Sequence, residues 1–144
     1  MPVWLQFALV VEEDWPPVGS ESLPFEKVAH GYKCCSVPLF VKGLSVDDVI
    51  GIEKYSEGFV YEWNHVQRSE RTTIWLARLA DHPPIEDCLR NLRLLECNTA
   101  SAEQLGCYAV DVPASLPIAE VDAWLEALDP EFVAIAFPSM RHPE

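Results

Sequence analysis

Two segments with helical spacing of apolar residues alternate with β-rich runs in residues 72–137, and this order limits the folds open to the chain. In one segment, apolar side chains follow Ile85 at the third, fourth, seventh and tenth positions, which places them on one face of a helix. A second stripe runs from Ile118 to Leu128. The β-rich runs cover residues 72–79, 97–101, 105–112 and 132–137. The resulting order, β-α-β-β-α-β, is typical of the ferredoxin-like fold, an antiparallel sheet with two helices on one face.

Local signals predict where these elements begin and end. Two prolines, Pro83 and Pro84, fit the first turn of the first helix, and Ser115 is positioned to cap the second. The second helix should end at Asp129, because Pro130 follows it. The run at residues 132–137 is apolar without interruption, which predicts a strand buried on both faces.

Residues 1–70 carry a different pattern, in which short β-rich runs are separated by turn residues. Between two of these runs, Ser45 and Asp48 have capping-box spacing, which predicts a single helical turn. Short strands with tight turns predict a small barrel or a strongly bent antiparallel sheet. We therefore predict an α+β chain with a β-rich subdomain over residues 1–70 and a ferredoxin-like subdomain over residues 71–144, packed together as one unit.

The charge of the chain is strongly negative and uneven. Of its 144 residues, 23 are acidic and 10 are basic, which gives a net charge of −13 at pH 7. Residues 1–26 contain five carboxylates and no Lys or Arg, and residues 100–144 contain eight carboxylates and Arg141. This charge argues against nucleic-acid and anionic membrane partners, which need Lys and Arg. It favours a basic protein partner, or else marks solvated faces that keep the protein in solution.

The cysteines indicate a reducing compartment. Their number is five, Cys34 and Cys35 are adjacent, and there is no C-x-x-C pair, so we expect free and mostly buried thiols. The apolar start lacks the basic segment of a signal peptide, and no apolar run reaches the ~20 residues that span a bilayer. These features predict a cytoplasmic protein.

Three segments of the chain resemble a family of small bacterial proteins. They are WPPVGSE at residues 15–21, PLFVKGLSVDDV at 38–49 and GCYAVDVP at 106–113. Their order and content are similar to the domain of unknown function 4265 family, and the Gly-Leu-Ser-x-x-Asp-Val block is the most specific part. The chain departs from the family pattern at Asp47, where the family has Gly, and at residues 132–137, where the family has a Trp and a Tyr. The resemblance implies a bacterial cytoplasmic origin and carries over no catalytic residue.

Few residues are suited to catalysis or metal binding. The chain has no Gly-rich phosphate loop, no nucleophile elbow and no paired metal ligands, so we expect neither a metal nor a cofactor. His65, Cys107 and Asp111 are the residue types of a nucleophilic site, but their spacing does not support one. The alternative is that His65 is a structural strand residue and that Cys107 belongs to the core.

Two acidic patches that each contain a tryptophan are the candidate binding residues. Trp15 follows three carboxylates at a turn that two prolines stiffen, and Trp124 lies beside the apolar stripe of the second helix. A rigid aromatic anchor among carboxylates suits a basic partner. The alternative is that both tryptophans pack in the interior. The predicted partner-binding residues are Glu12, Glu13, Asp14, Trp15, Glu120, Asp122, Trp124, Glu126 and Asp129.

These observations favour an acidic binding or inhibitory protein without enzymatic activity. The most concrete expectation is a monomeric bacterial immunity protein that neutralises a basic, cytoplasm-acting toxin domain by blocking its active site. One alternative is a small-molecule-sensing regulatory domain, because ferredoxin-like sheets often bind ligands. A second alternative is a hydrolase or transferase that uses His65 and Cys107.

Overall fold

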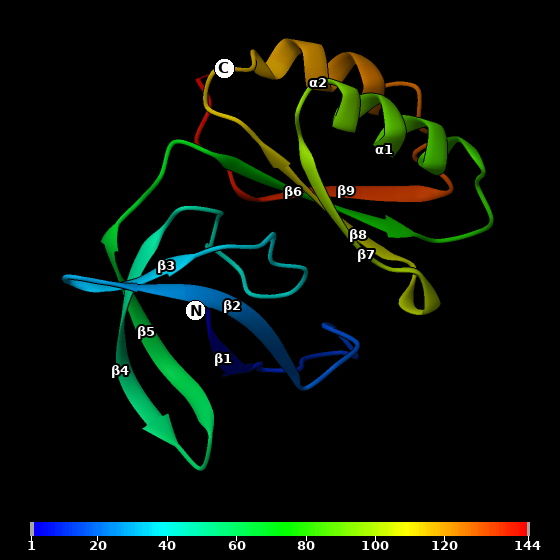
Figure 1. The fold of residues 1–144 in the computed structure, drawn as a ribbon. Helices are drawn as coiled ribbons and strands as arrows, with labels where there is room; N and C mark the ends of the chain where they lie inside the picture. Colours follow the sequence, from blue (N-terminus) through cyan, green and yellow to red (C-terminus); the bar gives the residue numbers. More distant parts are fainter. Residues whose placement is uncertain (1, 144) are drawn as a thin grey trace.

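A closed barrel precedes a second sheet that carries two helices on one face (Figure 1). The computed structural model describes residues 2–143. The barrel strands are β1 (Val3–Ala8), β2 (Ser20–Val28), β3 (Gly31–Cys34), β4 (Val49–Ser56) and β5 (Phe59–Gln67). The predicted α+β architecture, with a barrel-like first half and a ferredoxin-like second half, is confirmed.

The barrel closes through one parallel contact. Successive strands pair antiparallel from β1 to β5, and β1 then pairs parallel to β5 at Phe7 and Val60. Inward residues alternate along the strands and form an apolar core, with Phe7 and Phe25 packed at a ring separation of 5.7 Å. At Gly31, a Cβ atom would collide with the carbonyl oxygen of Ile50, so only glycine allows β3 to approach β4 this closely.

The second sheet has the strand order β7-β8-β6-β9, and all its pairs are antiparallel. This is the order expected of the ferredoxin-like arrangement. Its elements are β6 (Thr72–Arg78), α1 (Pro84–Leu94), β7 (Asn98–Ala102), a 3₁₀ turn (Glu103–Leu105), β8 (Cys107–Val112), α2 (Ile118–Leu125) and β9 (Val133–Ser139). The predicted subdomain boundary at residues 70 and 71 falls in the segment that joins β5 to β6.

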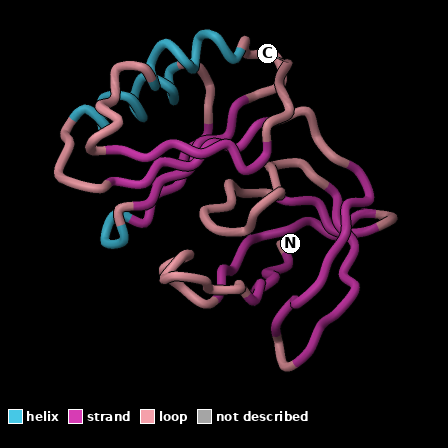
Figure 2. The backbone as a smooth tube through the Cα atoms, turned by 180° about the vertical axis from the view of Figure 1, so that it is seen from behind, coloured by secondary structure: helices cyan, strands magenta, loops and turns pink. Residues whose placement is uncertain are grey.

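The two faces of the second sheet have different neighbours. Both helices lie on one face, where Leu89 and Val121 pack against Leu76 and Val110. The opposite face is turned toward the barrel, as the views from front and back both show (Figures 1 and 2). Between them lies the loop of residues 35–48, which joins β3 to β4 and buries apolar side chains against Ala109 of β8.

The prediction of a final strand buried on both faces is wrong. β9 lies at the edge of the sheet and pairs with β6 on one side, and its Ile135 and Phe137 are 38% and 43% exposed. A continuous apolar run is typical of a central strand, but the connection from α2 delivers this segment to the outer side of β6. The apolar residues of this run therefore belong to a partly exposed edge strand and not to a strand buried on both faces.

Two predicted helix starts also differ from the structure. Ser45 and Asp48 form a hydrogen-bonded turn and not a helical turn, because Asp47 has a positive φ of 71° that a right-handed helix excludes. Positive φ suits glycine best, so the Gly that the family resemblance leads us to expect here would fit this conformation. At α2, no side chain caps the helix, whose N-cap residue is Pro117 in place of the predicted Ser115.

Candidate partner-binding groove

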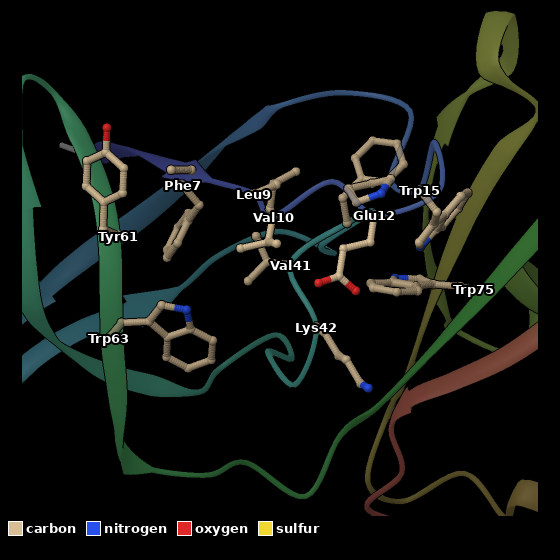
Figure 3. Close-up of a pocket in the computed structure, with 13 residues that line it drawn as sticks. Phe7, Leu9, Val10, Glu12, Trp15, Val41, Lys42, Tyr61, Trp63 and Trp75 are labelled. Carbon is tan, nitrogen blue, oxygen red and sulfur yellow. The ribbon is translucent and has the colours of Figure 1, made fainter.

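Two adjoining hollows lie between the barrel and the uncovered face of the second sheet. Their volumes are about 360 and 580 Å³, and both are lined by Trp15, Lys42 and Trp75. We call them together the tryptophan groove. The first hollow reaches into the barrel side, where Tyr61 and Trp63 line it (Figure 3). The second runs over the uncovered face of the sheet to β9.

A tight turn carries Trp15 into the groove. The backbone amides of Glu12 and Trp15 each donate to the other residue's carbonyl oxygen, at 2.9 and 3.0 Å. Glu13 and Asp14 at the tip both have positive φ, as in the turns that close β-hairpins. Trp15 is 44% exposed and contacts Phe40 edge-on, with ring centroids 6.1 Å apart. It is therefore a surface aromatic residue, and the alternative of a buried Trp15 is wrong.

The second wall of the groove comes from a loop that Glu21 holds in place. The Glu21 carboxylate accepts hydrogen bonds from the backbone amides of Leu39, Phe40 and Val41, at 2.7, 2.9 and 3.0 Å. These bonds fix the segment that carries Phe40 and Lys42 into the groove. Burial raises the pKa of Glu21 and outweighs the three donors, which act to lower it.

On the barrel-facing side of the sheet, small side chains of β9 leave space beside Trp75, whereas Ala109 on its other side is buried under the loop of residues 35–48. In the strand register, Trp75 lies between Ala109 of β8 and Ala136 of β9. Two positions along, Ala77 lies next to Ala134, so neighbouring residues on this face are also small. The Trp75 indole is held by a hydrogen bond from its Nε1 to the carbonyl oxygen of Pro38, at 2.9 Å.

One carboxylate and one ammonium group line this groove together with aromatic side chains. The Glu12 side chain reaches into the hollow between Trp63 and Trp75, and Lys42 lies below it (Figure 3). Tryptophan faces attract cations, and a nearby carboxylate strengthens that preference. The groove can therefore accept a cationic side chain beside Glu12, with Lys42 available to an acceptor group of the same partner.

The predicted acidic patches are divided by the structure. Of the first patch, Glu12 and Trp15 line the groove, while Glu13 and Asp14 are exposed at the tip of the turn. The members of the second patch also separate around α2. Asp122 and Glu126 line shallow hollows beside β9, whereas Trp124, which is 38% exposed, is not among the residues that line them. Glu120 is exposed, and Asp129 accepts a hydrogen bond from the amide of Glu131 at 2.9 Å.

The residues of the hydrolase alternative have separate partners. His65 bonds to Asp48 and packs edge-on against Trp63, with ring centroids 5.0 Å apart. Cys107 lies in the other sheet, donates to the carbonyl oxygen of Leu105 at 3.5 Å, and has a pKa that burial raises. Asp111 forms an ion pair with Arg71 at 2.6 Å. These contacts do not assemble a nucleophile, a base and an orienting carboxylate.

Within residues 2–143, His, Cys, Asp and Glu side chains form no group of three that could hold a metal ion. All five cysteines are free thiols, and Cys35 alone among them is exposed. No helix in this part of the chain is long and apolar enough to cross a membrane.

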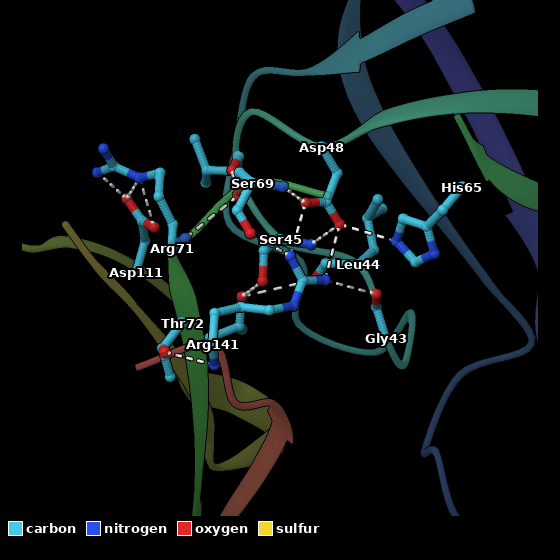
Figure 4. A network of polar contacts seen from close by, with 12 residues as sticks. Gly43, Leu44, Ser45, Asp48, His65, Ser69, Arg71, Thr72, Asp111 and Arg141 are labelled. Carbon is cyan, nitrogen blue, oxygen red and sulfur yellow. Dashed lines mark hydrogen bonds and ion pairs between the residues drawn. The ribbon is translucent and has the colours of Figure 1, made fainter. Parts of the chain in front are cut away.

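A buried polar network joins the barrel to the second sheet and so fixes the walls of the groove (Figure 4). At its centre is Asp48, whose side chain is fully buried. Its carboxylate accepts two hydrogen bonds from the Arg141 guanidinium, at 2.9 and 3.0 Å, and bonds to His65 at 2.9 Å. The backbone amides of Ser45 and Ser69 donate two further hydrogen bonds to this carboxylate, at 3.0 and 2.8 Å.

The segment after β9 anchors this network. Arg141 also donates to the carbonyl oxygens of Ser69 and Gly43, at 2.7 and 3.3 Å. His142 is buried, bonds to Thr72 at 2.6 Å and bonds to the carbonyl oxygen of Pro113 at 2.8 Å. No local sequence pattern marks either residue, because partners such as Asp48 and Thr72 lie 93 and 70 residues away in the chain. The Asp48 position within the family-like block was the one available signal.

We expect Asp48→Asn to lower the free energy of unfolding by about 3–5 kcal/mol, because it leaves the Arg141 charge buried without its partner. Chemical denaturation measures this change. Asp47→Asn is the matched control, since that neighbouring side chain is exposed and asparagine tolerates positive φ. Equal stability of the two variants would contradict the role assigned to Asp48.

The same carboxylate should make stability depend on acid. Burial alone would raise the pKa of Asp48, but hydrogen bonds from Arg141, Ser69 and Ser45 outweigh it and lower the pKa below its usual 3.8. The contribution of a lowered pKa is present above the usual value and lost as the pH falls through the folded value. Between about pH 5 and pH 2, the melting temperature of the wild type should therefore fall more steeply than that of Asp48→Asn. If the melting temperatures of the two proteins fall in parallel with pH, Asp48 does not make stability depend on acid. Glu21 is present in both proteins, so its contribution cancels in the difference between their melting temperatures.

We expect Glu21→Gln to destabilise the protein by about 1–3 kcal/mol, because an amide oxygen replaces a carboxylate that accepts three buried donors. Amide hydrogen exchange at residues 39–41 should quicken more than the average of the barrel. Glu26→Gln, at an exposed position of the same strand, is the control. If exchange at residues 39–41 is unchanged, Glu21 does not hold this loop.

Comparison with known proteins bears on the fold and on the family. A solved structure titled "Novel crystal structure of a hypothetical protein from Neisseria gonorrhoeae" superposes with a TM-score of 0.72 at 16% sequence identity. The match covers 99% of this chain and 98% of that one, so the barrel and the helix-covered sheet occur together in both. None of the curated proteins compared with this chain matched its sequence.

The sequence also matches a family model over most of its length. That match spans residues 21–134, which include Glu21, the loop to Asp48, the strand of Trp75 and both helices. The resemblance predicted from three short segments is thereby confirmed. This chain belongs to the family described as Domain of unknown function (DUF4265).

Proposed function

We propose that this protein binds a basic protein partner at the tryptophan groove and acts as its inhibitor. In its most concrete form, the proposal is a bacterial immunity protein that works as a monomer in the cytoplasm and blocks the active site of a basic toxin domain. The observation that carries the proposal is the exposed Trp15, held on a tight turn beside Glu12 and opposite Trp75.

Three properties of the groove suit a protein partner. Trp15 is presented by a backbone that two cross-turn hydrogen bonds fix, so little conformational entropy is lost when a partner covers it. Central aromatic residues of this kind supply most of the binding energy at interfaces. The net charge of −13 would speed the encounter with a basic partner and would oppose an acidic one.

A small-molecule ligand is the second candidate function. The two hollows have volumes of about 360 and 580 Å³, within the range of ligand sites, and aromatic side chains with one carboxylate and one ammonium line the first. A zwitterionic ligand with an apolar body would match that lining. Such a ligand would raise the melting temperature in a screen of metabolites, whereas a protein partner predicts a flat screen.

The test of the main proposal uses the product of the neighbouring gene, co-expressed with this chain. We expect the two proteins to co-purify, and we expect this chain to protect cells from that product. Trp15→Ala should weaken the complex by about thirtyfold or more, the effect of losing a central aromatic anchor. Isothermal titration calorimetry measures the change.

Trp4→Ala is the matched control, because Trp4 is 64% exposed on β1 and does not line either hollow of the groove. Glu12→Gln should slow association at low salt and have less effect at high salt. A neighbouring product that is harmless, or that binds Trp15→Ala and Trp4→Ala equally well, would refute the proposal.

A further inference from the structure

The outer side of β9 is an open sheet edge of unusual composition. Among the described residues β9 pairs with β6 alone, so the backbone groups on its other side face outward. Exposed edges are usually protected by charged side chains, by short length or by proline. The seven residues of β9 carry no charged side chain, and Pro138 lies near its end. The opposite edge, β7, is shorter and polar, so the two edges are not equivalent.

An apolar shelf borders this edge on the helix side. It comprises Ile118 and Ala119 of α2, Ile135 and Phe137 of β9, and Met140. Three of its members, Ile135, Phe137 and Met140, are 38–43% exposed, so the shelf is not filled by the protein's own side chains. A strand that pairs with β9 would place alternate side chains against this shelf.

The charged side chains around the shelf indicate which kind of partner strand would bind there. Asp122 of α2 and Glu126, the C-cap residue of that helix, line it. No Lys or Arg occurs between Arg93 and Arg141 in the sequence, and Arg141 is engaged by Asp48. Within residues 2–143, neither Asp122 nor Glu126 forms an ion pair. A strand with Lys or Arg next to apolar residues would satisfy both the shelf and the carboxylates.

We propose that β9 is a strand-addition site for an extended, basic segment of a partner protein, whose apolar side chains fill the shelf and whose Lys or Arg side chains reach Asp122 and Glu126. A second copy of this chain fits less well, because symmetric pairing would bring the same carboxylates together and each copy carries a net charge of −13. The site adjoins the second hollow of the tryptophan groove, which Ile135 and Phe137 also line, but Trp15 is not part of the site. Its test therefore does not depend on the proposed function.

The probe is a nine-residue peptide with an acetylated N-terminus and an amidated C-terminus. Thr occupies every second position, and the positions between them, which would face the shelf, alternate between Lys and Val. We expect its addition to shift the backbone amide signals of residues 133–137 in NMR spectra and to slow their hydrogen exchange. A peptide with Glu in place of Lys should bind at least about tenfold more weakly, as should one with N-methylated amides on its pairing edge.

Two double variants separate this site from general electrostatics. Asp122→Asn with Glu126→Gln should weaken binding of the Lys peptide about tenfold, while Glu86→Gln with Asp87→Asn, exposed in the first turn of α1, should change it little. Peptide binding that persists in Trp15→Ala would show that this site stands even if the groove proposal fails. No binding, shifts centred on Trp15 and Trp75, or a dimer that already protects β9 would overturn the inference.

Discussion

The structure depends on one buried carboxylate at the junction of its two sheets. Asp48 stands immediately before β4, and its main partner, Arg141, follows β9. An ionised group without water needs a full set of partners, and Asp48 has them in two backbone amides, a guanidinium and an imidazole. These partners come from the barrel, the connecting segment and the chain after the last strand, so the charge is satisfied only when all three are in place.

That requirement explains how a surface groove keeps its shape. Trp15 and Lys42 belong to the barrel and its loop, whereas Trp75 belongs to the second sheet. Without a fixed junction, the two walls would be free to separate, and an anchor between them would lose its pre-organised geometry. Glu21 acts on a smaller scale, because its carboxylate holds the loop that carries Phe40 and Lys42.

Much of the fold could be predicted because the local spacing of apolar residues indicates which segments form helices and which form strands. The stripes of α1 and α2 and the intervening strands set the β-α-β-β-α-β order, which chain connectivity then limits to one sheet topology. The position of β9 was not predictable in this way, since an apolar run has the same composition at a sheet edge as at its centre. Trp15 and Glu12 could be proposed from a local turn pattern. Trp75, Glu21 and Arg141 could not, because their roles depend on contacts across 18 to 93 residues of chain.

The central claim is that the tryptophan groove receives a cationic side chain of a protein partner. The most direct measurement is a structure of this chain bound to the partner with which it co-purifies. The account predicts a Lys or Arg of the partner within about 6 Å of the Trp15 or Trp75 ring and in hydrogen-bond contact with Glu12. A complex in which Trp15 remains exposed and the groove stays empty would contradict it.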